Sequence, residues 1–565
     1  MWSRKILGGD ARSCVSIMYI QKQKPMNQNK HSIFLWSRKI FMWSRNFFSS
    51  SRKILRLYPF LILLVFGCTT EPEVDILITD ALIYDGSNTA PQTGDVGIIG
   101  ERIAFIAADT NVRARRIIEG AGYTLAPGFI DPHTHSLRDL RSPGRNSNIN
   151  YLTQGVTTVV NSNDGGGPVD IAAEFDTLLK RGIGTNTAFM APHGSIRRLI
   201  MRNADRAPTE EELDNMKTMV ERAMEDGALG LSAGLFYAPG SFSETQEVIE
   251  LAKIAARYGG YYDVHMRDES SYNIGLLNAV RETIAIADGA GIPANISHIK
   301  CLGADVWGLS DEVVAIVDSA RAAGLQITAD QYPFEASSTS FSAALLPRWV
   351  VANDPDWQNK LTDVSFLPRI REGIAENLRR RGGPESILLI RPADSTLTGL
   401  TLGDVADQLD TDPVVAAIQI MLRGGSSIAS FNMQESDIKT FMQQPWVMTC
   451  SDGGSPHPRK FASYPAKIKK YVLEEEVLTL TQMIHRSTGM VAEVTGMPER
   501  GFIRPGYYAD LILFKPEELE VHSTFADPVQ LSEGMHMVLV NGTPTIDAGE
   551  YTGALAGQAV KRNAE

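Results

Sequence analysis

Cysteine is scarce in this chain, and its scarcity excludes two common ways of stabilising a fold. The 565 residues include four cysteines, Cys14, Cys68, Cys301 and Cys450. Their spacing matches neither a zinc ribbon nor a disulfide framework. The chain therefore depends on its hydrophobic core, and it is long enough for a large barrel plus an accessory domain.

Positive charge is in deficit after the first 67 residues. That segment holds 12 of the 54 Lys and Arg residues and one acid, Asp10, so the rest of the chain carries 42 bases and 65 acids, a net charge of −23. Nucleic-acid binding needs positive charge against the phosphates, and the sequence has no basic stripe with interleaved aromatics. We therefore expect no nucleic-acid partner.

The apolar run near the N-terminus is shorter than the roughly 20 residues of a membrane-spanning helix. In "RKILRLYPFLILLVFGC" a basic start and an apolar run precede a small residue and Cys68. This pattern indicates a signal peptide, so we assign residues 1–67 to a leader. Parts of "MWSRKI" recur within residues 1–41, and "MWSRN" begins at Met42, where we favour the true start of translation.

The end of this leader, "VFGC" followed by "TTEPEV", resembles a bacterial lipoprotein signal. The resemblance implies that Cys68 becomes a lipidated N-terminus. Because Thr69 follows it, the resemblance favours the outer membrane. We expect a protein of the bacterial cell envelope that is lipid-anchored at the periplasmic face of that membrane.

Short strands at both ends of the rest of the chain predict one small β-domain. "DILITDALIYDG" and "DVGIIGERIAFIAAD" lie near the start, and "ADLILF" and "MVLVNGTPTIDAGEY" lie near the end. Asn541-Gly542 in the last segment is a strong hairpin signal. Neither half is large enough to stand alone, so residues 73–125 and 503–560 are expected to pair.

Between these ends, apolar strands alternate with helical segments such as 209–226, 244–258 and 311–323. The expected strands lie in "APGFIDPHTH", "GVTTVVN", "TNTAFMAPH", "GALGLSAG", "GYYDVHM", "IPANISHIK", "LQITADQY" and "WVMTCSD". Eight such repeats predict a (β/α)8 barrel of the TIM type over residues 126–502. The last connection is too long for a bare loop, so we expect residues 338–440 to form a helical, lid-like insertion.

Polar residues follow these strands, where barrels of this kind carry their active sites. They are His133, His135, Asp164, His193, His265, His298, Lys300, Asp330, Tyr332 and Asp452. A single histidine at a strand end is more often structural, but five of the ten histidines in the chain fall at these positions. Imidazole and carboxylate together predict a divalent metal, Zn²⁺ first, with Fe²⁺ or Mn²⁺ as alternatives.

The pattern resembles the amidohydrolase superfamily and, within it, the N-acyl-D-amino-acid deacylases (D-aminoacylases). The resemblance lies in "HTH" after the first strand and in "SAGLFYAPG", "HMRDES", "ISHIKC", "DQYPFEASSTS" and "TCSDGGSPHPR". It covers roughly residues 73–550. It implies metal-assisted hydrolysis of the amide bond of N-acyl-D-amino acids, which releases a D-amino acid and a carboxylate.

The resemblance also implies roles for the residues at the strand ends. It makes His133, His135, Asp164, His265, His298 and Asp452 ligands of one or two zinc ions. Asp452 would shuttle the proton, and His193 would either steady the intermediate or pack as a loop residue. Asp164 stands where the family has a bridging cysteine, so another divalent metal is possible, and a plain turn residue is the competing interpretation.

Family substrates carry a free carboxylate, which implies a clamp. Lys300, with Tyr332 and Ser338, is the expected carboxylate binder, with Arg348 and Tyr237 as partners. Phe236 and Met433 fall where the family lines its side-chain pocket, although each could equally be core.

Two other functions remain open at the level of sequence. One is cyclic-amide hydrolysis of the dihydroorotase or hydantoinase kind, although its usual strand-four lysine is missing from "GALGLSAG". The other is an envelope binding protein whose metal site has decayed, which the retention of five metal-ligand candidates argues against. Dipeptides that contain a D-residue are further possible substrates, and the sequence does not give the oligomeric state.

Overall fold

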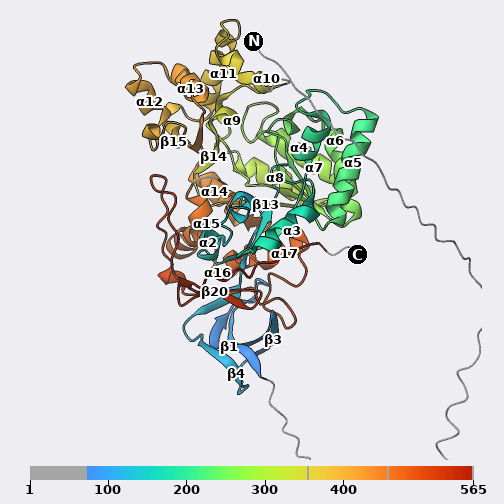
Figure 1. The fold of residues 1–565 in the computed structure, drawn as a ribbon, viewed down its shortest axis with the longest axis vertical. Helices are drawn as coiled ribbons and strands as arrows, with labels where there is room; N and C mark the ends of the chain where they lie inside the picture. Colours follow the sequence, from blue (N-terminus) through green and yellow to red (C-terminus); the bar gives the residue numbers. More distant parts are fainter. Residues whose placement is uncertain (1–72, 353–355, 455–456, 563–565) are drawn as a thin grey trace, which may run out of the picture. The chain divides into compact units, whose positions relative to one another are not determined.

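The structure is a computed structural model, and it describes residues 73–352, 356–454 and 457–562 (Figure 1). Residues 1–67 and Cys68 lie outside the described residues, so the signal and its lipidation stay predictions. Within the described part of the chain, no helix combines the length and apolar character needed to cross a membrane.

One nine-stranded sheet joins the two ends of the described chain. Its order is β21-β20-β19-β18-β5-β1-β2-β3, and β4 pairs with β1. The strands are β1 (Val74–Ile83), β2 (Gln92–Ile99), β3 (Arg102–Ala107), β4 (Ala114–Glu119), β5 (Thr124–Pro127), β18 (Leu511–Phe514), β19 (Met535–Val540), β20 (Thr543–Asp547) and β21 (Glu550–Tyr551). The antiparallel pair β18–β5 is the link between the early and late strands. Asn541 and Gly542 connect β19 to β20 with φ of 49° and 74°, the left-handed pair of a tight hairpin.

Parallel strands form two further sheets in a mixed α/β arrangement. Their orders are β17-β13-β12-β11-β10-β9 and β6-β7-β8. The strands are β6 (Phe129–Asp131), β7 (Val156–Asn161), β8 (Asn186–Phe189), β9 (Ala191–Pro192), β10 (Gly230–Gly234), β11 (Tyr261–His265), β12 (Ala294–Ile296), β13 (Ile327–Gln331) and β17 (Val447–Thr449). Each of the eight expected segments contains one of these strands, and the third contains both β8 and β9. All of their residues are buried, as expected for parallel strands covered on both faces.

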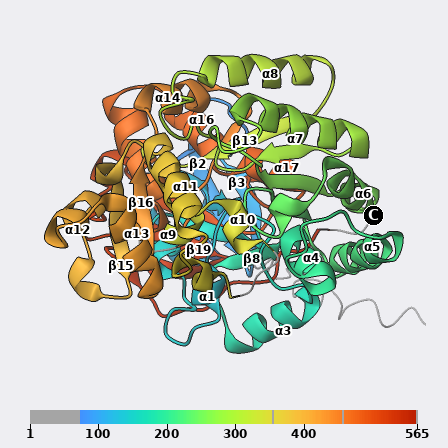
Figure 2. The same ribbon diagram turned by 90° about the horizontal axis from the view of Figure 1, so that it is seen from above.

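Helices follow most of these strands and pack outside them. Figure 2 shows α3 to α8 following one another around the parallel strands in chain order. They are α3 (Ile171–Arg181), α4 (His193–Met201), α5 (Glu210–Glu225), α6 (Thr245–Arg257), α7 (Leu276–Ala290) and α8 (Ser310–Ala322). The start of α5 is fixed by a capping box in which Thr209 and Glu212 bond each other's backbone N–H groups.

Shorter helices complete the covering of the strands. They are α1 (Leu137–Leu140), α2 (Ile149–Leu152), α14 (Glu435–Gln443), α15 (Arg459–Lys467), α16 (Leu480–His485) and α17 (Gly489–Thr495).

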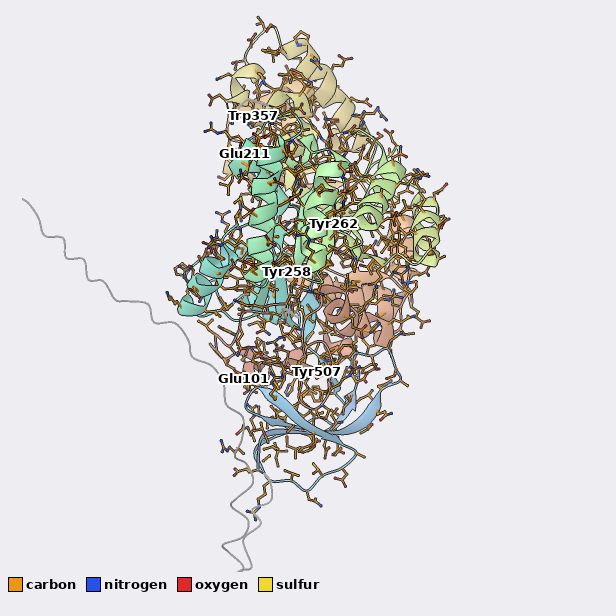
Figure 3. The ribbon with its side chains drawn as sticks, turned by 90° about the vertical axis from the view of Figure 1, so that its right-hand side faces the viewer. Glu101, Glu211, Tyr258, Tyr262, Trp357 and Tyr507 are labelled. Carbon is orange, nitrogen blue, oxygen red and sulfur yellow. The ribbon has the colours of Figure 1, made fainter. Side chains whose placement is uncertain are left out.

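The segment between β13 and β17 is not purely helical, which corrects the sequence-based expectation. It contains α9 (Phe341–Leu345), α10 (Arg348–Val351), α11 (Leu367–Arg380), α12 (Leu402–Gln408) and α13 (Pro413–Leu422). It also contains a three-stranded antiparallel sheet, ordered β14 (Ala336–Ser340), β16 (Ser426–Phe431) and β15 (Ile387–Pro392). The helices and this sheet enclose their own apolar core. Trp357, labelled in Figure 3, belongs to this segment.

Candidate functional site

The carboxyl ends of the parallel strands meet at a cavity of ≈ 360 Å³. His135 comes after β6, Asp164 after β7, His298 after β12 and Asp452 after β17, while His265 is the last residue of β11. All five side chains line the cavity. His133 lies behind them and is fully buried. Residues separated by more than 300 positions are thus brought together because parallel strands end on one side of their sheets.

Asp164 stands at the centre of four imidazoles. Its Oδ1 lies 3.4 Å from Nε2 of His133, 3.6 Å from Nδ1 of His265 and 3.5 Å from Nε2 of His298. Its Oδ2 lies 3.3 Å from Nε2 of His135. Two atoms that each lie ~2.0–2.2 Å from one tetrahedral zinc are separated by about 3.3–3.6 Å. The spacing around Asp164 is therefore that of ligands sharing a metal.

The donor atoms divide into two sets that share Asp164. His265 Nδ1 and His298 Nε2 face each other at 2.9 Å on one side. On the other side, Oδ1 of Asp452 lies 3.2 Å from Nε2 of His135 and 3.7 Å from Nε2 of His133. Two sets of this kind can hold one or two divalent ions.

Three observations indicate that this cluster fits a cation. Ligand atoms of His133, Asp164, His298 and Asp452 all lie within 4.8 Å of one another. Both ring nitrogens of His133 and Oδ1 of Asp164 are buried without a hydrogen-bond partner, a costly state that a bound cation would relieve. Asp164, His298 and Asp452 have positive φ values of 55°, 36° and 47°, and such strain is typical of functional sites.

Glu269 lines the same cavity and contacts His298, and the sequence analysis missed it. Its Oε1 lies 3.1 Å from Nδ1 of His298 and accepts a hydrogen bond from Nζ of Lys300 at 2.7 Å. Burial would raise the pKa of Glu269, but the charges of Lys300, His265 and His298 hold it well below its ordinary value. Its only sequence signal is its position four residues after His265 in "HMRDES".

Arg459 pairs with Asp452 and was also missed. Its Nη1 lies 2.8 Å from Oδ2 of Asp452, and its guanidinium carbon lies 4.8 Å from the centroid of the Tyr332 ring. Burial would raise the pKa of Asp452, but the charge of Arg459, followed by that of His298, holds it far below its ordinary value. Arg459 begins α15, so this helix fixes the guanidinium relative to the strand end that carries Asp452.

Arg381 is a third cation of the same cavity, and no pattern in the surrounding sequence predicts it as a site residue. It follows α11 in the insertion and is buried, and its Nε donates to the carbonyl of Ala344 at 3.3 Å. Among the described residues, no carboxylate lies within ion-pairing distance of its guanidinium. The cavity therefore combines metal-type ligands with three cationic side chains, those of Lys300, Arg381 and Arg459.

The other predicted substrate residues divide between two cavities and the core. Lys300, Tyr332, Ser338, Tyr237 and Phe236 line the cavity beside the histidines.

Arg348 lines a neighbouring cavity instead, and for Met433 and His193 the structure favours the packing alternative over a role in the site. Met433 is packed in the main hydrophobic core and lines neither of these two cavities. His193 is fully buried at the start of α4, where its Nε2 lies 2.9 Å from Oε1 of Glu247, which Arg197 also binds. This pairing takes the imidazole out of the cavity, so the geometry contradicts contact with reacting atoms.

Comparisons with known proteins give relatives along most of the chain. No protein-family model matches. D-aminoacylase of Alcaligenes xylosoxydans xylosoxydans is 30% identical over 517 residues, which cover 87% of this chain and 98% of the relative. The crystal structure of N-acyl-D-glutamate deacylase from Bordetella bronchiseptica, with zinc and a phosphonate that mimics the tetrahedral intermediate, has a TM-score of 0.75 and 30% identity. It covers 87% of this chain and all of that one.

A structure that addresses the binuclear metal centre of D-aminoacylase has a TM-score of 0.74 and 27% identity, and covers 86% of this chain and all of its own. With the donor set around Asp164, these similarities support a divalent metal at the site.

Proposed function

This chain belongs to the D-aminoacylase family of amidohydrolases, and we infer that it hydrolyses the amide bond of N-acyl-D-amino acids, releasing a D-amino acid and a carboxylate. The observation that carries this function is the position of Asp164, whose carboxylate lies within 3.6 Å of four imidazoles. The family relation gives the linear amide as the bond that the site acts on.

We propose that the parallel strands close into a (β/α)8 barrel. Support comes from β8 and β9, which are separated by one residue and so connect the two parallel sheets. On the other side, Thr134 and Gly453 form a parallel bridge, and the N–H of Asp452 donates to the carbonyl of His133 at 2.9 Å. We propose the domain limits that the sequence predicts. Residues 73–125 and 503–560 form the small β-domain, residues 126–502 form the barrel, and residues 338–440 form the insertion.

Zn²⁺ is the metal that we propose for the site. Asp164, His265 and His298 would hold one ion, and His133, His135, Asp164 and Asp452 would hold a second. A divalent ion bound there polarises a carbonyl and lowers the pKa of a bound water from 15.7 to about 7. Because a carboxylate is a harder ligand than the cysteine that the family resemblance gives at this position, harder divalent metals compete better here.

Asp452 is the proposed proton carrier. Its Oδ2 is held by Arg459 at 2.8 Å, while Oδ1 faces His135 across the cavity. The ionised carboxylate can accept the proton of the attacking water and then give it to the departing amide nitrogen. Arg459 keeps this carboxylate ionised and fixes its direction.

The carboxylate of the substrate fits the same side of the cavity. It lies two bonds from the departing nitrogen, so it must bind near Asp452, and Arg459 is the cation nearest to that residue. Arg381 and Lys300 add positive charge to the cavity, although Lys300 is already bonded to Glu269. Of the three cations that line the cavity, Arg381 has no carboxylate partner among the described residues, which favours an anionic substrate.

The test is the release of free amino acid from matched N-acetyl-D- and N-acetyl-L-amino acids by the zinc-loaded protein, with methionine first and a panel of side chains after it. We expect turnover of D-substrates that a chelator abolishes and added Zn²⁺ restores. Turnover of L-substrates alone, or of cyclic amides alone, would contradict the proposal.

We also propose that the protein is anchored in the bacterial envelope through a lipid on Cys68. The support for this proposal is the leader sequence before Cys68. Its test is described in the Discussion.

A further inference from the structure

A cavity of ≈ 280 Å³ lies beside the catalytic cavity, and we call it the cationic cavity. Gly454 lines both cavities, so they meet where the chain leaves β17. A Cβ on Gly454 would lie 2.9 Å from the Cβ of His135, so the glycine backbone packs directly against this proposed metal ligand. Because glycine has no side chain, the division between the two cavities is thin at this point. The proposed function leaves the cationic cavity without a role.

Four cations and one acid line the cationic cavity, which gives its lining a net charge of +3. They are Arg138 and Asp139 of α1, Arg145 of the following loop, Arg391 of β15 and Lys460 of α15. The chain after the leader carries more acids than bases, so this part of the molecule reverses the overall balance. Cations that gather from separate segments of an acidic chain indicate a site for an anionic group.

Only part of this positive charge is neutralised within the protein. Lys460 donates a hydrogen bond to Oδ2 of Asp139, and Nη1 of Arg145 lies 3.2 Å from Oδ1 of the same carboxylate. The side chains of Arg138 and Arg391 form no ion pair or hydrogen bond with any residue that the structure describes. Arg138 and Arg391 are therefore the cations of this lining that are available to a ligand.

Much of the remaining lining is apolar. Ile149, Phe461, Val529 and Leu531 line the cationic cavity, and the last two are exposed. Large apolar side chains at the surface beside unpaired cations fit a ligand that has an apolar stretch and an anionic end. A chain of methylene groups that ends in a carboxylate has both features, and a guanidinium can bind this carboxylate through two parallel hydrogen bonds.

The orientation of the substrate directs its acyl half toward this cavity. The guanidinium carbon of Arg459 lies 4.8 Å from the centroid of the Tyr332 ring, and Tyr332 follows β13, so the amino-acid half with its free carboxylate lies on the β13 side. Asp452, which gives the proton to the departing nitrogen, follows β17. Strand β17 pairs with β13, and the Thr134–Gly453 bridge joins its end to that of β6. The two halves of a trans amide extend to opposite sides of the C–N bond, so the acyl half extends toward the end of β6, where the two cavities meet.

We propose that the cationic cavity binds the far end of the acyl group and that Arg138 and Arg391 select acyl chains that end in a carboxylate. This inference rests on the proposed function and names its substrate class, which is D-amino acids acylated by one end of a dicarboxylic acid. The acyl half of a dipeptide with a free amino terminus carries an ammonium group instead, which the net positive charge of the cavity repels.

The experiment compares N-succinyl-, N-adipoyl-, N-suberoyl- and N-sebacoyl-D-amino acids with the N-butanoyl, N-hexanoyl, N-octanoyl and N-decanoyl compounds of the same lengths. The measured quantity is the ratio of kcat/KM for each pair, because effects of chain length are common to both members and cancel. We expect a ratio of about 10 or more for at least one length, as one charge-assisted hydrogen bond gives. Arg138→Gln combined with Arg391→Gln should bring that ratio close to 1, because Arg145 and Lys460 stay bonded to Asp139.

Arg371→Gln combined with Arg423→Gln is the matched control. Both arginines are exposed on the insertion that carries Arg391, and neither lines the catalytic cavity or the cationic cavity. This variant removes the same net charge and should leave the ratio as in the wild type.

Three results would overturn the acyl-site proposal while turnover itself upholds the proposed function. They are a wild-type ratio near 1 at every length, an unchanged ratio in the variant of Arg138 and Arg391, and an equal fall of the ratio in the control variant. If no compound is hydrolysed, the proposed function fails, and calorimetric binding of the same pairs then decides the acyl site, with equal affinities overturning it.

Discussion

Nη1 of Arg459 lies 2.8 Å from Oδ2 of Asp452, and both side chains are buried at the edge of the catalytic cavity. The ion pair ties the first turn of α15 to the end of β17. A buried charge pair with this geometry orients the carboxylate and leaves its other oxygen, Oδ1, toward His135. The same guanidinium retains donors for a substrate carboxylate, so one residue can connect substrate binding to the proton carrier.

Arg459→Gln should therefore weaken turnover of free acids more than turnover of the matching C-terminal amides. The expected loss in kcat/KM on acids is about 10- to 100-fold, because one charge-assisted contact is removed. Arg459→Lys keeps the charge and should recover part of it. Steady-state kinetics on acid and amide pairs measure this difference, and equal losses on both would point to general damage instead.

Metal binding and proton transfer should separate in a second set of variants. His265→Ala and His298→Ala each remove a ligand candidate beside Asp164 and should lose metal and activity together. Asp452→Asn keeps the size of the side chain but cannot take up a proton. It should retain most of the tightly bound metal while turnover falls about 10²- to 10⁴-fold. Metal content by mass spectrometry beside kcat gives the answer, and near-normal turnover in Asp452→Asn would remove its role.

Replacing Asp164 with the cysteine of the family pattern tests how this residue sets the metal preference. Asp164→Cys should supply a thiolate at the centre of the four imidazoles and shift the metal preference toward Zn²⁺ over Mn²⁺. Competition between the two metals, followed by metal analysis, measures the shift. Asp164→Ala should lose metal, and retention of both metal and rate in that variant would leave Asp164 as a turn residue only.

The leader gives a prediction that is independent of the site. Cys68→Ser removes the only sulfur in the expected lipidation motif and should release the protein from the membrane fraction. Two acyl chains plus an amide-linked third are enough for stable anchoring, so the change should be large. Fractionation of cells producing each form tests it, and an unchanged membrane fraction would contradict the anchor.

The strands and most ligand candidates could be predicted because their signals are local. Runs such as "YYDVH" mark buried strands, and in a sheet of parallel strands the next polar residue must lie at the shared edge. His133, His135, His265 and His298 were found in this way. Asp164 and Asp452 followed from the same rule.

The contacts that depend on tertiary structure could not be predicted in this way. Arg459 stands in a proline-containing loop sequence and Arg381 in a run of arginines, both of which are typical of exposed surface. His193 shows the opposite error, because the sequence proposed it for the site and the structure places it outside the cavity. It sits at a strand end as expected, but it is also the first residue of α4, whose direction turns its ring toward Glu247.

The insertion was assigned as helical for a related reason. β14 reads "ASSTS" and β16 reads "SSIASF", and neither has the apolar alternation by which a strand is recognised. These serine-rich strands form because β16 pairs with β14 on one side, where Ser337 faces Ser430, and with β15 on the other. The partners in β14 and β16 are more than 80 positions apart in the sequence, which a local pattern does not reveal.

The buried Lys467, which is not among the proposed metal ligands, should make the stability of the protein depend on pH. Its side chain is fully buried and donates one hydrogen bond, to Oγ1 of Thr449 at 3.0 Å. Burial lowers the pKa of Lys467 to about 7, with the positive charge of Arg486 as a further cause. In the unfolded chain a lysine has a pKa near 10.4. Between pH 7 and pH 10 the unfolded chain therefore binds more protons at this position, and the contribution of Lys467 to stability rises with pH.

The free energy of unfolding should accordingly depend on pH less in Lys467→Met than in the wild type. Integrating the difference in bound protons between the unfolded and the folded chain gives the size of the effect. From pH 7 to pH 9 the free energy of unfolding of the wild type should rise by about 2 kcal/mol relative to that of Lys467→Met. Urea unfolding at both pH values measures it, and taking the difference between the two proteins cancels the titration of all other groups. Lys469→Met removes the same charge two residues away and controls for the change in net charge. If the stability difference between wild type and Lys467→Met is the same at pH 7 and pH 9, the buried lysine is charged throughout, and another group must compensate for it.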